Sequence, residues 1–300
     1  MMLTAGCLRA VPVRADRGYT TGTYARCPCE ESAWIPEGRT TVAETRTAVV
    51  TGASSGIGGA TVRQLRERGW DVVGVARRKE RLDALAEETG AATFVADVTS
   101  DDDVASLVAF LKARGPVNAL VNVAGGAIGS DYVENAPIDA WREMYETNVL
   151  GMVRVTKAIL PLLREAALTM PNSDILTVSS TAGHIAYEGG GGYTAAKHGT
   201  TTIVETLRLE LAGEPIRVME IAPGMVKTPE FSVNRFGGDQ AKADKVYENV
   251  QDVIDENDVA RVMVEMLEMP TQINLDLVVV RPLAQAAQYK VHRGPLKPKL

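Results

Sequence analysis

The chain has 300 residues, of which 45% are hydrophobic and 23% are charged, and its formal net charge is −6 at pH 7. These fractions are typical of a globular protein with a substantial core. The negative charge argues against a partner that is nucleic acid or an anionic membrane, and no apolar run approaches the roughly 18 residues that a membrane-spanning helix needs. We therefore expect a cytoplasmic protein whose partner is neither nucleic acid nor a membrane.

Residues 1–41 differ from the rest of the chain, because they are rich in Arg, Gly, Pro and Thr and lack helical or strand periodicity. We predict either a disordered extension or a mis-assigned start, in which case the protein begins near Val42. The three cysteines, Cys7, Cys27 and Cys29, all lie in this segment, so the main body has no disulfide framework. No second Cys or His cluster completes a site with Cys27 and Cys29, and we expect no metal.

A regular alternation of apolar strands and amphipathic helices begins at Thr45. In chain order the segments are "TAVV", the turn "TGASSGIGGAT", "VRQLRERG", "DVVGVA", "KERLDALAEETG" and "ATFVADV". A strand, a glycine turn, a helix and a second strand form the βαβ unit of a doubly wound parallel sheet. The predicted fold is α/β: a single Rossmann domain over 42–290, with a mostly parallel sheet of about seven strands and helices on both faces. Residues 291–300 are expected to be a loose tail.

The glycine turn after the first strand predicts a dinucleotide site. Gly52 permits the tight turn, Gly56 lets the backbone approach a pyrophosphate, and Gly58 lets the helix pack closely on the strand. The helix then offers free N–H groups and its positive dipole end to the phosphates. The cofactor residues expected in this turn are Gly52, Ser54, Ser55, Gly56, Ile57 and Gly58.

The end of the second strand selects between the two dinucleotides. An NAD enzyme usually carries Asp or Glu there, whereas this chain has Ala76 followed by Arg77 and Arg78. A guanidinium attracts a 2′-phosphate through charge-assisted bonds that a carboxylate cannot make. The alternative is that both arginines are solvated charges at the start of the next helix, a place where cations are mildly unfavourable. We predict NADP(H) as the cofactor.

Seven short stretches, in order, resemble the short-chain dehydrogenase/reductase family over about residues 45 to 285. They are "TGASSGIG" (51–58), "ADV" (96–98), "NVAG" (122–125), "NVLG" (148–151), "VSS" (178–180), "YTAAK" (193–197) and "PGMVKT" (223–228). One position departs from the family pattern: Val123 stands where a second Asn is usual. We expect altered local hydrogen bonding there without loss of activity.

The resemblance implies a role for individual residues. Ser180, Tyr193 and Lys197 would be the catalytic set, with Asn148 supporting Lys197 through water. Tyr193 and Lys197 would also contact the cofactor. The remaining cofactor contacts would be Asp97 and Val98 at the adenine, Asn122 and Gly125 along the groove, and Pro223, Gly224, Val226 and Thr228, of which Thr228 holds the nicotinamide carboxamide. Related enzymes pair the helices expected near 138–164 and 193–213 across symmetry axes, so we expect a homo-oligomer, a dimer or a homotetramer.

The chemistry of the residues agrees with this implied role. A free tyrosine has a pKa of about 10, and a neighbouring ammonium group lowers that pKa by stabilising tyrosinate. Tyr193 and Lys197 are spaced to share one face of a helix. Ser180 ends an apolar strand and would hydrogen-bond the substrate oxygen. A Tyr and a Lys at this spacing are also common on ordinary helices, and it is the serine and the nucleotide fold that favour catalysis.

The segment 229–250 interrupts the alternation and is predicted to be a substrate lid. The stretches "TPEFSVNRF", "VYENV" and "INLDLVVVRPLAQA" resemble the NADP-dependent 3-hydroxy acid dehydrogenases, also described as serine or L-allo-threonine dehydrogenases. Arg235 would grip a substrate carboxylate, unless it is an exposed loop residue. We predict an alcohol oxidoreductase (EC 1.1.1.-) acting on small hydroxy acids. The alternatives are a reductase of other carbonyls, such as a 3-oxoacyl thioester, aldehyde or ketone, and an NADP sensor without turnover.

Overall fold

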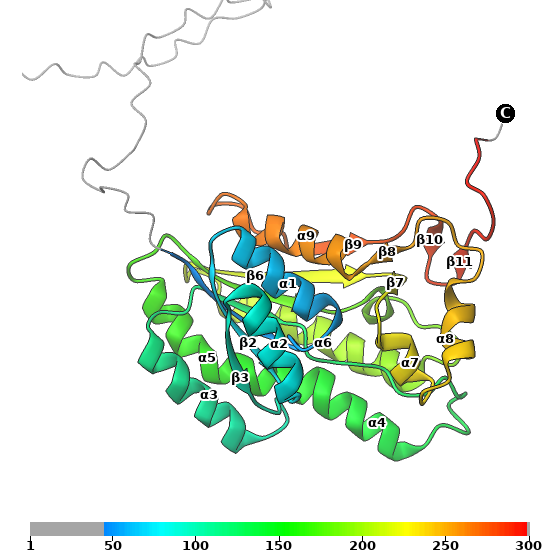
Figure 1. Ribbon diagram of the computed structural model, residues 1–300, viewed down its shortest axis with the longest axis horizontal. Helices are drawn as coiled ribbons and strands as arrows, with labels where there is room; N and C mark the ends of the chain where they lie inside the picture. Colours follow the sequence, from blue (N-terminus) through cyan, green and yellow to red (C-terminus); the bar gives the residue numbers. More distant parts are fainter. Residues whose placement is uncertain (1–44, 299–300) are drawn as a thin grey trace, which may run out of the picture. The chain divides into compact units, whose positions relative to one another are not determined.

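The computed structural model describes residues 45–298, and the predicted N-terminal extension with its cysteines lies outside the described residues. Within that part of the chain, seven strands form one sheet in the order β3-β2-β1-β4-β5-β6-β9, and all neighbours are parallel. The strands are β1 (Thr47–Thr51), β2 (Asp71–Ala76), β3 (Ala92–Val95), β4 (Ala119–Asn122), β5 (Ser173–Val178), β6 (Ile216–Pro223) and β9 (Leu277–Val280). The predicted doubly wound α/β fold is confirmed (Figure 1).

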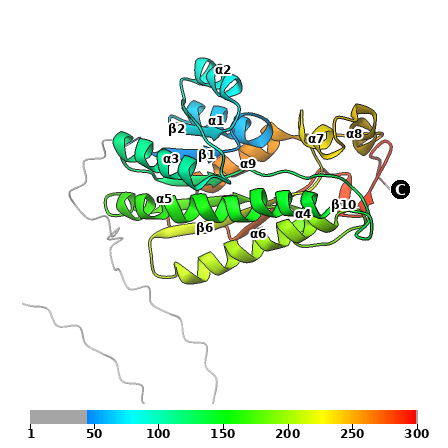
Figure 2. The ribbon, with the colours of Figure 1, turned by 90° about the horizontal axis from the view of Figure 1, so that it is seen from below.

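Helices cover both faces of the sheet, as Figure 2 shows. One face carries α1 (Gly56–Glu67), α2 (Lys79–Thr89) and α9 (Glu256–Glu268), and the other carries α3 (Asp101–Arg114), α5 (Met152–Ala166) and α6 (Gly191–Glu210). The central strands are apolar on both sides: Val50 packs in the core with α1, whereas its neighbour Val49 packs in the core with α3 and α5. This alternation explains why the strands read as continuous apolar runs.

The strand order reverses between β1 and β4, which are direct neighbours although α1 to α3 separate them in sequence. Chains leaving β1 and β4 at their carboxyl ends turn to opposite sides, and a crevice opens between them. The glycine turn 51–58 begins at the last residue of β1, and the segment 122–126 begins at the last residue of β4. The topology alone therefore directs a ligand to this edge.

Shorter elements complete the carboxyl edge of the sheet. α4 (Ile138–Tyr145) continues through a π-helical turn, η1 (Glu146–Gly151), into α5. A 3₁₀ turn, η2 (Thr181–Gly183), follows β5. The short pair β7 (Val226–Lys227) and β8 (Ile254–Asp255) brackets the segment predicted as a lid, which contains α7 (Phe231–Arg235) and α8 (Gln240–Tyr247). No helix of residues 45–298 is both long and apolar enough to cross a bilayer.

The C-terminal segment is held against the end of α8. After the hairpin of β10 (Gln285–Ala287) and β11 (Lys290–Val291), Arg293 donates to the carbonyl of Val246 at 3.2 Å. The Gly294 N–H donates to the Asn249 carbonyl at 2.6 Å, and the Leu296 N–H donates to Gln251 Oε1 at 2.8 Å. Arg293, Gly294 and Leu296 are thus hydrogen-bonded to the chain between Val246 and Gln251. Most of the acceptors are backbone carbonyls, which leave no signal in the sequence.

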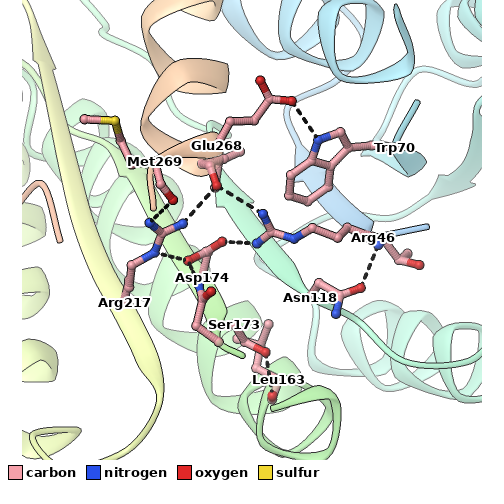
Figure 3. A network of polar contacts seen from close by, with 12 residues as sticks. Arg46, Trp70, Asn118, Leu163, Ser173, Asp174, Arg217, Glu268 and Met269 are labelled. Atoms are coloured by element: carbon pink, nitrogen blue, oxygen red, sulfur yellow. Dashed lines mark hydrogen bonds and ion pairs between the residues drawn. The ribbon is translucent and has the colours of Figure 1, made fainter. Parts of the chain in front are cut away.

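A buried ion cluster closes the opposite, amino-terminal edge of the sheet (Figure 3). Asp174 at the start of β5 is fully buried, and its Oδ1 accepts from Arg217 Nε at 2.6 Å. Its second carboxylate oxygen accepts from Arg46. Arg217 also donates to the carbonyl of Leu267 in α9 at 2.9 Å. The cluster joins β5, β6, α9 and the chain before β1 at the end of the domain away from the crevice.

Candidate active site

The glycine turn 51–58 packs so closely that side chains are excluded. A Cβ on Gly52, whose φ is +69°, would lie 2.9 Å from the Ala124 nitrogen, and one on Gly58 would lie 2.3 Å from the Gly52 carbonyl oxygen. Ser55 is the N-cap of α1, and its side chain does not cap the helix, while Ile57 packs against the core. The first-turn N–H groups of α1 are therefore available to an anion. These features fit a dinucleotide pyrophosphate.

Arg78 lies against the same turn. Its Nη2 donates to Ser54 Oγ at 2.9 Å and to Ser55 Oγ at 2.8 Å, and its Nη1 donates to Glu230 of the predicted lid at 2.8 Å. Arg77 is more exposed, and its Nη1 lies 3.8 Å from Asp97 Oδ2. Arg78, and not Arg77, therefore contacts the serines of the glycine turn, where a 2′-phosphate is expected.

Asp97 and Val98 follow β3 at the same edge. Burial alone would raise the pKa of the Asp97 carboxyl, but hydrogen bonds from the Thr99 N–H and hydroxyl and the charge of Arg77 lower it. Val98 is buried, and its carbonyl accepts from Arg154 at 3.2 Å. That both residues border the adenine stays a prediction.

The segment after β4 forms the middle of the crevice. The side-chain amide of Asn122 donates to Thr156 at 3.1 Å, so it points into the interior and not along the groove. The N–H groups of Val123 and Ala124 both donate to Thr51 Oγ1, at 3.0 and 3.1 Å. At the position where the family has a second Asn, a backbone bond to Thr51 therefore ties β4 to β1.

Gly125 lies beside the catalytic candidates. A Cβ there would lie 2.5 Å from Asn148 Oδ1 and 3.6 Å from Lys197 Nζ. Asn148 sits in the π-helical turn η1, where its Nδ2 donates to the carbonyls of Gly126 at 3.0 Å and Met144 at 2.7 Å. Its side chain thus fixes the loop next to Lys197, and its support of Lys197 through water stays a prediction.

The segment 223–228 lines the other side of the crevice. Gly224 is pressed against Gln285, since a Cβ on it would lie 2.2 Å from Gln285 Oε1. Pro223 ends β6 and Val226 begins β7. A Cβ on Gly56 would lie 3.7 Å from the Thr228 Cβ, so Thr228 faces the glycine turn directly.

Ser180, Tyr193 and Lys197 converge at the carboxyl end of β5. Ser180 Oγ donates to the Pro223 carbonyl at 3.3 Å and accepts from the Ala182 N–H at 3.1 Å. Tyr193 and Lys197 lie one turn apart near the start of α6 and are buried, at 8% and 5% exposure. Lys197 Nζ donates to the Val178 carbonyl at 3.0 Å. The structure therefore assembles the three residues that the sequence predicted as a catalytic set.

Burial dominates the ionisation of this set. It raises the pKa of Tyr193 to about 12, against the effects of the Ser180 hydroxyl and the Arg235 charge. It lowers the pKa of Lys197 to about 8, against the raising effect of Glu220. The net pKa shift of Tyr193 is therefore upward and not downward as expected, because desolvation of the phenolate outweighs the groups that lower the pKa. Tyr193 is thus held as a phenol, the form that donates a proton.

Arg235, at the end of α7, reaches the same place from the lid. Its guanidinium carbon lies 5.9 Å from the centroid of the Tyr193 ring and 5.6 Å from that of Tyr187. Its Nε donates to the Gly129 carbonyl at 3.1 Å and its Nη2 donates to the Gly189 carbonyl at 3.3 Å. The cation is therefore held by two loops beside Tyr193 and is not an exposed loop residue.

A buried polar cluster behind the site was missed in the sequence. Glu220, 1% exposed, accepts from Thr201 Oγ1 at 2.9 Å, and its Oε1 lies 2.9 Å from His184 Nε2. His184 follows the Ser180 loop and Thr201 lies on α6, so the cluster joins the elements that carry Ser180 and Lys197. The one signal was an acid within the apolar strand "RVMEIA".

Comparison with known proteins agrees with this geometry. The sequence pattern of the short chain dehydrogenase family matches residues 46–235. An uncharacterized oxidoreductase of Mycobacterium tuberculosis is 47% identical over 252 residues, which are 84% of this chain and 97% of the relative. The NADP-dependent 3-hydroxy acid dehydrogenase YdfG of Salmonella typhi is 35% identical over 250 residues, 82% of this chain and 99% of the relative.

A solved structure described as the closed form of serine dehydrogenase complexed with NADP⁺ superposes with a TM-score of 0.75 at 34% identity. The match covers 82% of this chain and 99% of that chain. The protein belongs to the short-chain dehydrogenase family and is an oxidoreductase.

Proposed function

We propose that the protein transfers a hydride between NADP(H) and a small 3-hydroxy acid or hydroxy amino acid, or its oxo form. The cofactor assignment is supported by the glycine turn, by Arg78 beside Ser54 and Ser55, and by the NADP(H)-dependent relatives. The substrate class is carried by one observation, the Arg235 guanidinium held 5.9 Å from the Tyr193 ring.

The chain's own groups have distinct tasks in this reaction. Gly52, Gly56 and Gly58 leave room for the pyrophosphate, and Arg78 binds the 2′-phosphate. The bound nicotinamide supplies the hydride in reduction and accepts it in oxidation. In reduction the carbonyl π electrons move onto oxygen, and that oxygen takes the phenolic proton of Tyr193.

Two neighbouring groups stabilise the charge that this transfer creates. Ser180 Oγ donates a hydrogen bond to the developing alkoxide, for which it must leave its 3.3 Å bond to the Pro223 carbonyl. The Lys197 ammonium, one helical turn from Tyr193, stabilises the tyrosinate left behind. Oxidation of the alcohol uses the same groups in reverse, with tyrosinate as the base.

Arg235 gives the site its preference for an anion. A guanidinium binds a carboxylate through two parallel hydrogen bonds, which fix orientation as well as distance. Its present partners are neutral backbone carbonyls, so a carboxylate is a stronger acceptor for it than either of them. A carboxylate bound to Arg235 would lie close to Tyr193, because the guanidinium carbon is 5.9 Å from the centroid of that ring.

Initial rates followed by NADPH absorbance test this proposal. L-serine, L-allo-threonine and 3-hydroxyisobutyrate are offered with NADP⁺, and malonic semialdehyde and uncharged aldehydes with NADPH. Tyr193→Phe is expected to lower kcat by about 10²–10⁴, the usual contribution of a positioned acid. Arg235→Ala is expected to raise KM for the carboxylated substrates and to leave uncharged carbonyls unaffected, since only the former use the guanidinium.

A pocket beside Tyr193 favours a second candidate, the reduction of an uncharged carbonyl. Its lining is mostly apolar and comes from the loop before α4, from α4 itself and from the glycines before Tyr193; it includes Ile128, Pro137, Ala140, Trp141 and Met144. Turnover of uncharged aldehydes or ketones alone would establish this candidate and reject the hydroxy-acid substrate. Tight NADPH binding without hydride transfer to any carbonyl offered would instead indicate an NADP sensor.

We also propose that the protein is a homo-oligomer that associates through α4 and α6. A largely apolar hollow lies over these helices, and Tyr145 and Leu150 on its border are 47% and 40% exposed. Exposed apolar surface of this kind is typical of subunit contacts. Light scattering on the purified protein measures the state directly, and a monomer at all concentrations would reject the proposal.

A further inference from the structure

The carboxylate of Glu230, in the predicted lid, is bound to Arg78, the arginine at which the 2′-phosphate is expected. It is the N-cap residue of α7 and follows Thr228 closely. Its two oxygens accept from Arg78 Nη1 at 3.0 and 2.8 Å, and Oε1 lies 3.2 Å from Arg81 Nη2. The Glu230 side chain is 23% exposed, so the pair is partly shielded from water.

All three nitrogens of the Arg78 guanidinium donate hydrogen bonds to other residues of the chain. Nε and Nη2 donate to Ser54 Oγ at 3.2 and 2.9 Å, Nη2 also donates to Ser55 Oγ at 2.8 Å, and Nη1 donates to Glu230. A phosphate that binds Arg78 must therefore share or replace one of these acceptors. The serine hydroxyls are neutral, whereas Glu230 carries the same sign of charge as the phosphate.

The ionised state of Glu230 is favoured by its partners. Burial alone would raise the pKa of this carboxyl, but hydrogen bonds from Arg78 and Ser55 and the charges of Arg78 and Arg81 lower it. At neutral pH the group is a carboxylate, and a phosphate near Arg78 meets a negative charge at hydrogen-bond distance from the same nitrogen.

We propose that Glu230 competes with the 2′-phosphate of the cofactor for Arg78 and Arg81, so that a lid residue sets the affinity for the phosphorylated dinucleotide. This inference rests on the proposed function, because it takes Arg78 as the phosphate ligand. Glu230 begins the five-residue helix α7 and Arg235 ends it. Displacement of Glu230 by the phosphate therefore acts on the helix that carries the proposed substrate ligand.

Titration calorimetry with NADP⁺, NAD⁺ and 2′,5′-ADP tests the competition without turnover. The variants are Glu230→Gln, Glu230→Ala and the matched control Glu88→Gln. Glu88 lies on α2 and forms an ion pair with Arg63 at 2.7 Å, so its variant removes the same charge from an ion pair away from Arg78. Fragment 2′,5′-ADP carries the phosphate but lacks the nicotinamide, which separates the phosphate site from the catalytic site.

Both Glu230 variants are expected to lower the Kd of 2′,5′-ADP and NADP⁺ about fivefold, the effect of losing one competing, partly exposed ion pair. The Kd of NAD⁺ and all values for Glu88→Gln are expected to stay within about twofold. Weaker binding of 2′,5′-ADP by the Glu230 variants would overturn the inference and show that Glu230 orients Arg78. An unchanged Kd would show that Glu230 takes no part.

Failure of the proposed function gives a different result in the same experiment. Equal affinities for NAD⁺ and NADP⁺ in the wild type and in both Glu230 variants would show that Arg78 does not hold a phosphate. Wild-type protein that prefers NADP⁺, with Glu230 variants indistinguishable from it, would leave the cofactor assignment intact and remove only the competition.

Discussion

Replacement of Asp174 by alanine is expected to lower the free energy of unfolding by about 3 kcal/mol, toward the lower end of the cost of breaking a buried ion pair. The carboxylate is fully buried and accepts from Arg217 at 2.6 Å and from Arg46. Its removal leaves Arg217, 6% exposed, without its anionic partner. Arg217 keeps bonds to the carbonyls of Leu267 at 2.9 Å and Met269 at 3.0 Å, which limits the loss.

Urea unfolding followed by tryptophan fluorescence measures this loss, with Asp83→Ala as the control. Asp83 is 56% exposed at the side chain and pairs with Lys79 at 2.6 Å, so its replacement is expected to change stability by less than about 1 kcal/mol. The kcat of folded Asp174→Ala is expected to equal that of the wild type, because the cluster lies at the edge of the sheet away from Tyr193. A loss below 1 kcal/mol, or one equal to that of the control, would refute the reasoning.

Two further predictions concern the site. Gly58→Ala is expected to weaken NADP⁺ binding, measured by calorimetry, more than about tenfold, because the new Cβ would lie 2.3 Å from the Gly52 oxygen and the turn must move. The circular dichroism spectrum is expected to stay that of the wild type. Unchanged affinity would contradict the prediction. Burial lowers the pKa of Lys197 from 10.5 to about 8, so the side chain is charged below about pH 8 and neutral above it. The kcat/KM for carbonyl reduction is therefore expected to fall as the pH rises through about 8. Glu220→Gln removes a charge that raises this pKa, and the break should move to lower pH; a profile without a break in either protein would show that Lys197 does not titrate there.

The fold could be predicted, and a catalytic set proposed, because their signals are local. The glycine turn lies within eight consecutive residues, 51–58, and a strand before it and a helix after it are enough to define its use. The spacing of Tyr193 and Lys197 places them on one helical face without reference to the rest of the fold. Arg78 follows β2 by two residues, which predicts a position near a phosphate, and in the structure its side chain contacts Ser54 of the glycine turn.

The sequence by itself therefore determined the sheet, the glycine turn and the residue types that meet at the carboxyl end of β5, since short-range spacing and periodicity encode them. Only the tertiary structure decided how those residues behave. Glu230 accepts a hydrogen bond from Arg78, which lies 152 positions away in the sequence, and His184 contacts Glu220, 36 positions away. No local sequence pattern encodes either contact. The pKa of Tyr193 rises to about 12 and does not fall, because desolvation depends on everything packed around the ring and not on the lysine four residues away.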